Sequence, residues 1–176
     1  MLSERTSDAG DAEPELLITR DFDAPRDLVF KAYTEAEHLA RWWGPKGFTM
    51  LRCSVDLRPG GLFHYCMRSP DGQEMWGKLV YREIAVPERL AFVVSFSDAQ
   101  GGTARAPFSA DWPLEVLSTL TFTEHDGKTR LTMRSVAVAP TEAERNAFAA
   151  GQESVRQGAA LSLDQLAAYL ADLQRP

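Results

Sequence analysis

The hydrophobic pattern of the chain changes period once, and this change constrains the fold more than any other feature. Across much of residues 48–137, apolar side chains alternate with polar ones, and turn sequences separate the runs. Alternation with a period of two is typical of strands that bury one face. From Phe148 to Leu173, apolar residues recur instead at steps of three, four or seven, which is the periodicity of a helix. The pattern predicts an antiparallel sheet followed by a long amphipathic helix.

The strands themselves can be placed from the alternating runs and the turn residues between them. His125-Asp126-Gly127-Lys128 joins the last two runs, and Asp-Gly between alternating runs is the strongest short-range signal for a hairpin. The predicted strands are residues 15–23, 48–57, 62–68, 74–85, 89–97, 117–124 and 129–137.

Two short helices are expected between the first and second strands. The first begins near Pro25, since proline is tolerated where a helix starts. Thr34 and Glu37 have the spacing of a capping box that would start the second helix, and Gly44-Pro45 would end it. Thr141 and Glu144 have the same spacing before the C-terminal helix.

The hairpin formed by residues 48–57 and 62–68 has a register that the turn alone leaves open. A symmetric turn would pair Cys53 with Cys66, whereas the alternation favours Cys53 sharing a face with Tyr65. An extra residue at Gly60 or Gly61, forming a bulge, would satisfy the alternation. We therefore expect the bulge, with the two cysteines on opposite faces and unable to form a disulfide.

Residues 98–115 form a long connection, and loops of this length in compact domains are often functional. The segment contains Phe108 and Trp112, whose rings are costly to leave in water. We expect both rings to fold back over an apolar surface.

The order of elements predicts an α+β fold in which a curved antiparallel sheet of six to seven strands wraps around the C-terminal helix. A single helix does not fill a strongly curved sheet, so we expect a cavity between them. Gly151 and Gly158 lie near the apolar stripe of the helix, where glycine is unfavourable. They indicate a close approach, a kink, or room beside the helix.

Net charge argues against two classes of partner. The chain carries a formal charge of −6, whereas nucleic acid and anionic membrane surfaces attract basic proteins. Residues 1–13 form an acidic tail that we expect to be disordered, and residues 14–176 are predicted to form a single domain. The tail has no apolar stretch of the kind found in signal peptides, and only two cysteines occur, so we expect a cytoplasmic protein.

No complete catalytic constellation is evident. His38, Tyr65 and Glu74 are the only ionisable residues that we can name as weak candidates for a catalytic role. The histidines and cysteines lack the spacing of metal ligands, and no glycine-rich phosphate loop is present. We therefore predict neither a metal nor a cofactor.

The aromatic residues are the stronger signal, because ligand pockets are mostly apolar with a few polar groups. Trp42 and Trp43 are neighbours on a helix, about 100° apart, so one can pack inward while the other lies at the rim of a pocket. The predicted ligand-binding residues are Trp42, Trp43, Phe63, Tyr65, Trp76, Phe92, Phe96, Phe108, Trp112, Phe148, Ala159 and Leu163.

Four segments resemble the SRPBCC superfamily, also called START-like or helix-grip. They are Phe22-Asp23-Ala24-Pro25, the run from His38 to Pro45, the run from Asp56 to Gly61, and residues 158–170. Within the superfamily the chain is most similar to the branch related to the C-terminal domain of the activator of the heat-shock-protein-90 ATPase. That branch commonly has Gly-Trp where this chain has Gly158-Ala159, which implies a larger cavity here unless Phe148 or another aromatic ring fills it.

Three functions follow from the residues and the resemblance. The first, which we favour, is binding of an apolar or aromatic small molecule between the sheet and the C-terminal helix. The second is an enzyme, such as a cyclase or hydrolase acting on an aromatic or polyketide-like substrate. The third is a protein-interaction module of the chaperone-related kind, with a contact to a chaperone or to a second copy of the chain.

Overall fold

Residues 13–176 are described by the computed structural model of the protein. The predicted disordered tail therefore lies, except for Glu13, outside the described residues. In chain order the elements are β1 (Glu15–Phe22), α1 (Arg26–Thr34), α2 (Ala36–Trp42), β2 (Thr49–Val55), β3 (Leu62–Arg68), β4 (Glu74–Ala85), β5 (Arg89–Ser97), β6 (Thr103–Ala104), β7 (Val116–His125), β8 (Lys128–Ala137), α3 (Glu142–Ala150) and α4 (Gln152–Leu173).

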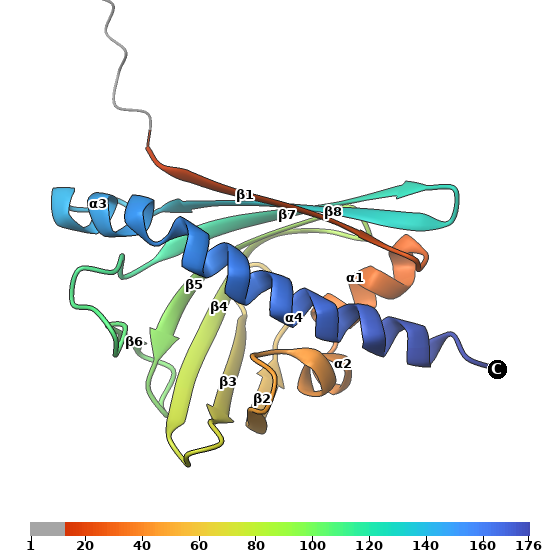
Figure 1. Ribbon diagram of the computed structural model, residues 1–176, viewed down its shortest axis with the longest axis horizontal. Coiled ribbons are helices and arrows are strands. Elements are labelled where there is room, and N and C mark those ends of the chain that lie inside the picture. The colour runs from red at the N-terminus through yellow and green to blue at the C-terminus, as the bar shows by residue number, and fades with distance from the viewer. Residues whose placement is uncertain (1–12) are drawn as a thin grey trace, which may run out of the picture.

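The strands form one antiparallel sheet in the order β1-β8-β7-β5-β4-β3-β2, with the short β6 paired to β5. The sheet curves, and α4 crosses its concave side, with α1 and α2 beside the C-terminal part of α4 and α3 at its other end (Figure 1). The predicted α+β helix-grip architecture is confirmed. All seven predicted strands are present, and the Asp126-Gly127 hairpin joins β7 to β8 as expected.

Alternation along each strand sends one set of side chains to the concave face, where the main core lies. Phe63 on β3, Leu79 on β4, Leu120 on β7 and Leu131 on β8 are almost completely buried there. They face an apolar stripe of α4 that is formed by Leu163, Leu166 and Leu170.

The β2–β3 hairpin has the face assignment that the alternation predicts, but its bulge is elsewhere. Cys53 pairs with Tyr65, and the register shifts between Met50 and Arg52 rather than at Gly60 or Gly61. The predicted position of the bulge is therefore wrong, because the turn closes without an irregular pair and the extra residue lies near the start of β2. Both cysteines are free, and they lie on opposite faces as expected.

The capping box predicted at Thr34 and Glu37 is wrong. Thr34 is the last residue of α1, and its hydroxyl donates to the carbonyl of Phe30 at 2.9 Å. Glu35 occupies the N-cap position of α2 without a side-chain cap. The cap predicted at Thr141 is present, since its hydroxyl accepts from the backbone N–H of Glu144 at 3.1 Å.

The C-terminal helical segment is divided in two, which corrects the expectation of one continuous helix. Gly151 separates α3 from α4. A Cβ atom at this position would lie 2.8 Å from a ring carbon of Trp112, whereas a Cβ at Gly158 would meet nothing within 4 Å. Gly151 thus permits the close approach of Trp112 where the two helices meet, whereas Gly158 is exposed and has free space for a side chain.

The long connection between β5 and β7 contains β6 and a run of aromatic side chains. Trp112 is half-buried against Phe148, with ring centroids 5.7 Å apart. Phe108 contacts Phe96 and Trp112 but is 66% exposed. Both rings therefore lie against apolar side chains as expected, although Phe108, at the outer end of the aromatic series, stays largely exposed.

Membrane insertion through a helix finds no support in the part of the chain that the structure describes. None of its helices combines the length and hydropathy that crossing a bilayer requires.

Candidate functional site

A partly open cavity of about 270 Å³ lies between the concave face of the sheet and α4. Its walls come from the end of α1, the Trp42-Trp43-Gly44 segment, the four strands β3, β5, β7 and β8, and one face of α4. The lining residues are Tyr33, Trp42, Trp43, Gly44, Tyr65, Met67, Phe92, Val94, Ser118, Leu120, Met133, Ala159, Ser162 and Leu163.

Two neighbouring tryptophans form one wall, but the helix predicted to hold both of them ends at Trp42, and Trp43 follows it in an extended conformation. Trp42 is buried, and its indole N–H donates to the carbonyl of Ala32 at 2.8 Å. Trp43 is only partly buried and lies edge-on to Phe63 and Tyr65, with ring centroids 5.2 and 5.7 Å away. Trp42 therefore anchors α2 to α1, while Trp43 presents its ring to the cavity.

Gly44 connects this wall to α4. Its φ of +100° is a left-handed conformation that glycine adopts without steric cost, and the side chain of Met67 occupies the space that a Cβ would need. Its carbonyl accepts hydrogen bonds from the side chains of Gln165 and Ser162 on α4. The backbone turn after α2 thus fixes α4 over the cavity.

The α4 wall has small side chains at the cavity. Ala159 and Ser162 line the cavity together with Leu163. Phe148 does not fill the space, because it lies on α3 against Trp112. The cavity therefore extends to Ala159 on α4.

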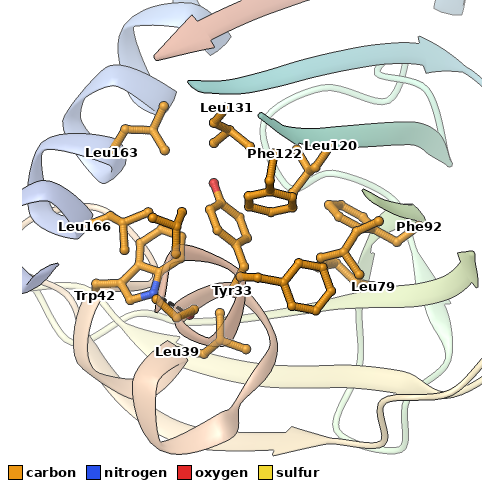
Figure 2. Close-up of a cluster of buried hydrophobic side chains, with 14 of the residues drawn as sticks. Tyr33, Leu39, Trp42, Leu79, Phe92, Leu120, Phe122, Leu131, Leu163 and Leu166 are labelled. Atoms are coloured by element: carbon orange, nitrogen blue, oxygen red, sulfur yellow. Dashed lines mark hydrogen bonds between the residues drawn. The ribbon is translucent and has the colours of Figure 1, made fainter. Parts of the chain in front are cut away.

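The polar groups at the cavity are hydroxyls. Tyr33 lies at the centre of the buried cluster (Figure 2), and burial raises the pKa of its phenol well above the usual range. Burial also raises the pKa of Tyr65, against a smaller opposing effect of a hydrogen bond with Trp43. The hydroxyls of Ser118 and Ser135 lie 2.7 Å apart. Both tyrosines are neutral at physiological pH, so the wall carries dipoles but no formal charge.

The structure brings together six of the twelve predicted ligand-binding residues. The six that line the cavity are Trp42, Trp43, Tyr65, Phe92, Ala159 and Leu163. Phe63 lies directly behind the wall, in contact with Trp43 and Tyr65. The part of these residues in ligand binding stays a prediction.

The other five predicted residues lie elsewhere. Trp76 pairs with Cys66 on the convex face and stacks on His64, with ring centroids 5.1 Å apart. Trp76 and Phe96 line a separate hollow of about 340 Å³ near the β3–β4 turn, whose wall includes Asp71, Glu74 and Arg105. Phe108, Trp112 and Phe148 form the aromatic series under the long loop.

The three weak catalytic candidates are not brought together. Only Tyr65 lines the cavity. His38 lies between α2 and α4, where Nδ1 is 2.6 Å from the hydroxyl of Tyr169 and Nε2 is 3.2 Å from a carboxylate oxygen of Glu35. Glu74 is exposed beside Arg68. Among residues 13–176, no group of three or more histidine, cysteine or acidic side chains could hold a metal ion.

Sequence reasoning missed eight lining residues, and the signal for several of them was present. Tyr33 follows Val29 by four positions, which places both on one face of α1. Ser118 and Leu120 share the parity of Phe122 on β7. The full set that was missed is Tyr33, Gly44, Met67, Val94, Ser118, Leu120, Met133 and Ser162.

Comparison with known proteins places the fold among solved relatives. The sequence profile of the family described as "Activator of Hsp90 ATPase homolog 1-like protein" matches residues 23–171. None of the curated proteins matches the chain.

Two solved structures illustrate the similarity. A crystal structure of a protein from Mycobacterium smegmatis is 31% identical, with a TM-score of 0.70 over 89% of this chain and 90% of that one. A protein from Nitrosomonas europaea is 24% identical, with a TM-score of 0.73 over 93% of this chain and 98% of that one. The second likeness bears on the fold alone.

Proposed function

The chain belongs to the family of activator of Hsp90 ATPase homolog 1-like proteins, and from this premise we propose that it binds a neutral, largely apolar small molecule in the cavity between the sheet and α4. The observation that carries the proposal is the cavity itself, which aromatic and aliphatic side chains line on the sheet side and Ala159 and Leu163 line on the helix side.

The size of the cavity suits a molecule of about two rings. Its volume is about 270 Å³, whereas an apolar cavity of roughly 150 Å³ is enough to bind benzene. A ligand of ten to fifteen non-hydrogen atoms would bind with a dissociation constant on the order of micromolar.

The absence of charge in the wall supports a neutral ligand. Among the described residues, those that line the cavity include no aspartate, glutamate, histidine, lysine or arginine. An ionised ligand would lose its hydration without gaining a partner of opposite charge, which is costly. The hydroxyl dipoles can orient a ligand, and they support binding better than acid–base catalysis, which needs a group whose pKa lies near the working pH.

Filling the cavity from α4 tests the proposal. Ala159→Trp adds an indole to the wall, and Ala168→Trp adds the same group on an exposed position of the same helix. We expect the wild-type protein and Ala168→Trp to bind 2-methoxynaphthalene, a neutral fluorescent probe with two rings, with equal affinity. Ala159→Trp should weaken binding at least tenfold, because the indole occupies the space of the probe.

Fluorescence titration gives the dissociation constants, and thermal unfolding shows whether each variant is folded. Equal binding by Ala159→Trp and the wild-type protein would place the probe outside the cavity. No saturable binding by the wild-type protein would contradict the proposal itself.

Contact with a chaperone is a second candidate, favoured by the exposure of Phe108 at the surface of the long loop. Aromatic side chains are enriched at protein–protein interfaces relative to the rest of the surface. If this contact forms, Phe108→Ser should reduce retention of the protein on immobilised Hsp90 several-fold, and Leu51→Ser, which changes another exposed apolar side chain, should not. Equal retention of the wild-type protein and Phe108→Ser would mean that Phe108 takes no part in a contact with Hsp90.

A further inference from the structure

The hydroxyl of Tyr33 is a hydrogen-bond donor without an acceptor. Tyr33 lies near the end of α1 and is 92% buried, being 8% exposed, and it lines the cavity. Figure 2 shows its hydroxyl directed toward the side chains of Leu131 and Leu163, which offer only carbon atoms. No hydrogen bond joins it to any other group in the described part of the chain.

The ring of Tyr33 is held firmly although its hydroxyl is not bonded. It lies edge-on to Trp42 and Phe122, with ring centroids 4.9 and 5.7 Å away. Trp42 is fixed in turn by its hydrogen bond to the carbonyl of Ala32. The phenol therefore points in a set direction, and its position in the cavity is determined by packing rather than by the polar atom.

A second donor lies in the same cavity. Ser118 and Ser135 are both buried, and one of their hydroxyls donates to the other across 2.7 Å. Whichever serine donates, the proton of the accepting hydroxyl has no acceptor among the described residues. When Ser135 is the donor, the unmatched proton belongs to Ser118, which lines the cavity, and this proton is then available to a ligand on the sheet side.

Buried hydroxyls normally find partners, and an unmatched donor inside a wall that is otherwise apolar is costly. We propose that the cavity selects neutral ring compounds that carry a hydrogen-bond acceptor, such as a ketone or quinone oxygen, and that the Tyr33 hydroxyl donates to this oxygen. The inference rests on the proposed function, since it names the class of ligand for the same cavity.

Acceptors fit this site better than donors do. A ligand alcohol that donated to the Tyr33 oxygen would leave the phenol proton unmatched, whereas a carbonyl oxygen matches it. A carboxylate would also accept the proton, but burying its charge beside a wall without cations is unfavourable. A carbonyl on a ring system satisfies the donor and the apolar surface together.

The experiment compares two probes of nearly the same shape. 2-Acetylnaphthalene carries a ketone oxygen, and 2-isopropenylnaphthalene has a CH₂ group in its place. Isothermal titration calorimetry would measure both dissociation constants for the wild-type protein, Tyr33→Phe and Tyr81→Phe. Tyr81 is the matched control, because its hydroxyl is also buried without a partner but does not line the cavity.

We expect the wild-type protein to bind the ketone about tenfold more tightly than the alkene, the scale of one hydrogen bond in a buried site. Tyr33→Phe should abolish this preference while leaving the affinity for the alkene within twofold, and Tyr81→Phe should keep the preference. A preference that survives in Tyr33→Phe, or one that is absent in the wild-type protein, overturns the inference.

The outcomes separate this inference from the proposed function. Equal binding of both probes, weakened for both by Ala159→Trp, would leave the cavity as the binding site and refute the role of Tyr33. Loss of the preference in Tyr65→Phe rather than Tyr33→Phe would move the donor to Tyr65 and likewise refute it. Binding of neither probe to the wild-type protein would contradict the proposed function and the inference with it.

Discussion

At the scale of single residues, the core of the fold contains a buried tyrosine hydroxyl that makes no hydrogen bond. Tyr81 on β4 is 1% exposed, and its hydroxyl has no hydrogen-bond partner. Burial raises the pKa of its phenol, with a smaller contribution from nearby Cys53. The ring fills the core, while the oxygen loses its hydration without compensation.

Tyr81→Phe should therefore stabilise the protein by about 1 kcal/mol, because it removes an unsatisfied polar group and keeps the ring. Urea denaturation measures the change in the free energy of unfolding. The matched control is Tyr169→Phe, which removes a hydroxyl that lies 2.6 Å from Nδ1 of His38 and should cost about 1 kcal/mol. Destabilisation by Tyr81→Phe would show that its hydroxyl is bonded in solution.

Single residues also show how far the site could be read from the sequence. The sequence predicted an apolar pocket with Trp42, Trp43 and Tyr65 in its wall. The reason was that large aromatic side chains tend to be buried. Trp76 is equally apolar, yet it lies on the convex face against His64. Composition cannot separate these cases, since the face of a residue depends on register.

At the scale of elements, the packing where α3 meets α4 requires glycine at position 151, whereas Gly158, seven residues later, has no such requirement. A Cβ at Gly151 would lie 2.8 Å from the ring of Trp112 and 3.2 Å from the carbonyl oxygen of Ala147. Trp112 cannot retreat easily because it packs on Phe148. At Gly158, inside α4, an added Cβ meets nothing within 4 Å.

The same substitution at the two glycines should therefore have opposite effects. Gly158→Ala should stabilise the protein by roughly 0.5–1 kcal/mol, since alanine is the better residue in a helix. Gly151→Ala should destabilise it by about 1–3 kcal/mol through overpacking against Trp112. Thermal or urea unfolding measures both changes, and a stabilising Gly151→Ala would mean that the close approach of Trp112 is absent in solution.

Elements were predictable to the extent that local sequence determines them. The strands could be placed because their alternation and turn residues are local signals, and the Thr141 cap followed from its spacing. The Thr34 cap failed because a threonine hydroxyl can bond within the preceding helix as well as begin the next one. The requirement for glycine at position 151 could not be predicted locally, because it comes from contact with Trp112, which lies 39 positions earlier in the chain.

At the scale of the whole molecule, the cavity exists because α4 is anchored along its length but filled only in part. Arg20 on β1 contacts Asp164 at 2.7 Å, Gln165 bonds to Gly44, and Tyr169 bonds to His38. These contacts hold the helix over the sheet while Ala159, at the cavity, leaves room beneath it.

The curved sheet and the crossing helix could be predicted from the change in hydrophobic period. The cavity could be predicted as well, because a single helix does not fill a strongly curved sheet. Its exact lining could not, because the point at which α4 crosses each strand depends on long-range contacts such as those of Gly44. Met133 and Val94 line the cavity for this reason, although nothing in their local sequence distinguishes them from core residues.

The central claim is that a neutral ring compound binds between the sheet and α4, and a crystal structure of the wild-type protein with 2-acetylnaphthalene tests it most directly. We expect density for the ring system beside Trp43 and Ala159, with the ketone oxygen within about 3 Å of the Tyr33 hydroxyl. An empty cavity at saturating probe, or the probe bound outside it, would contradict the account.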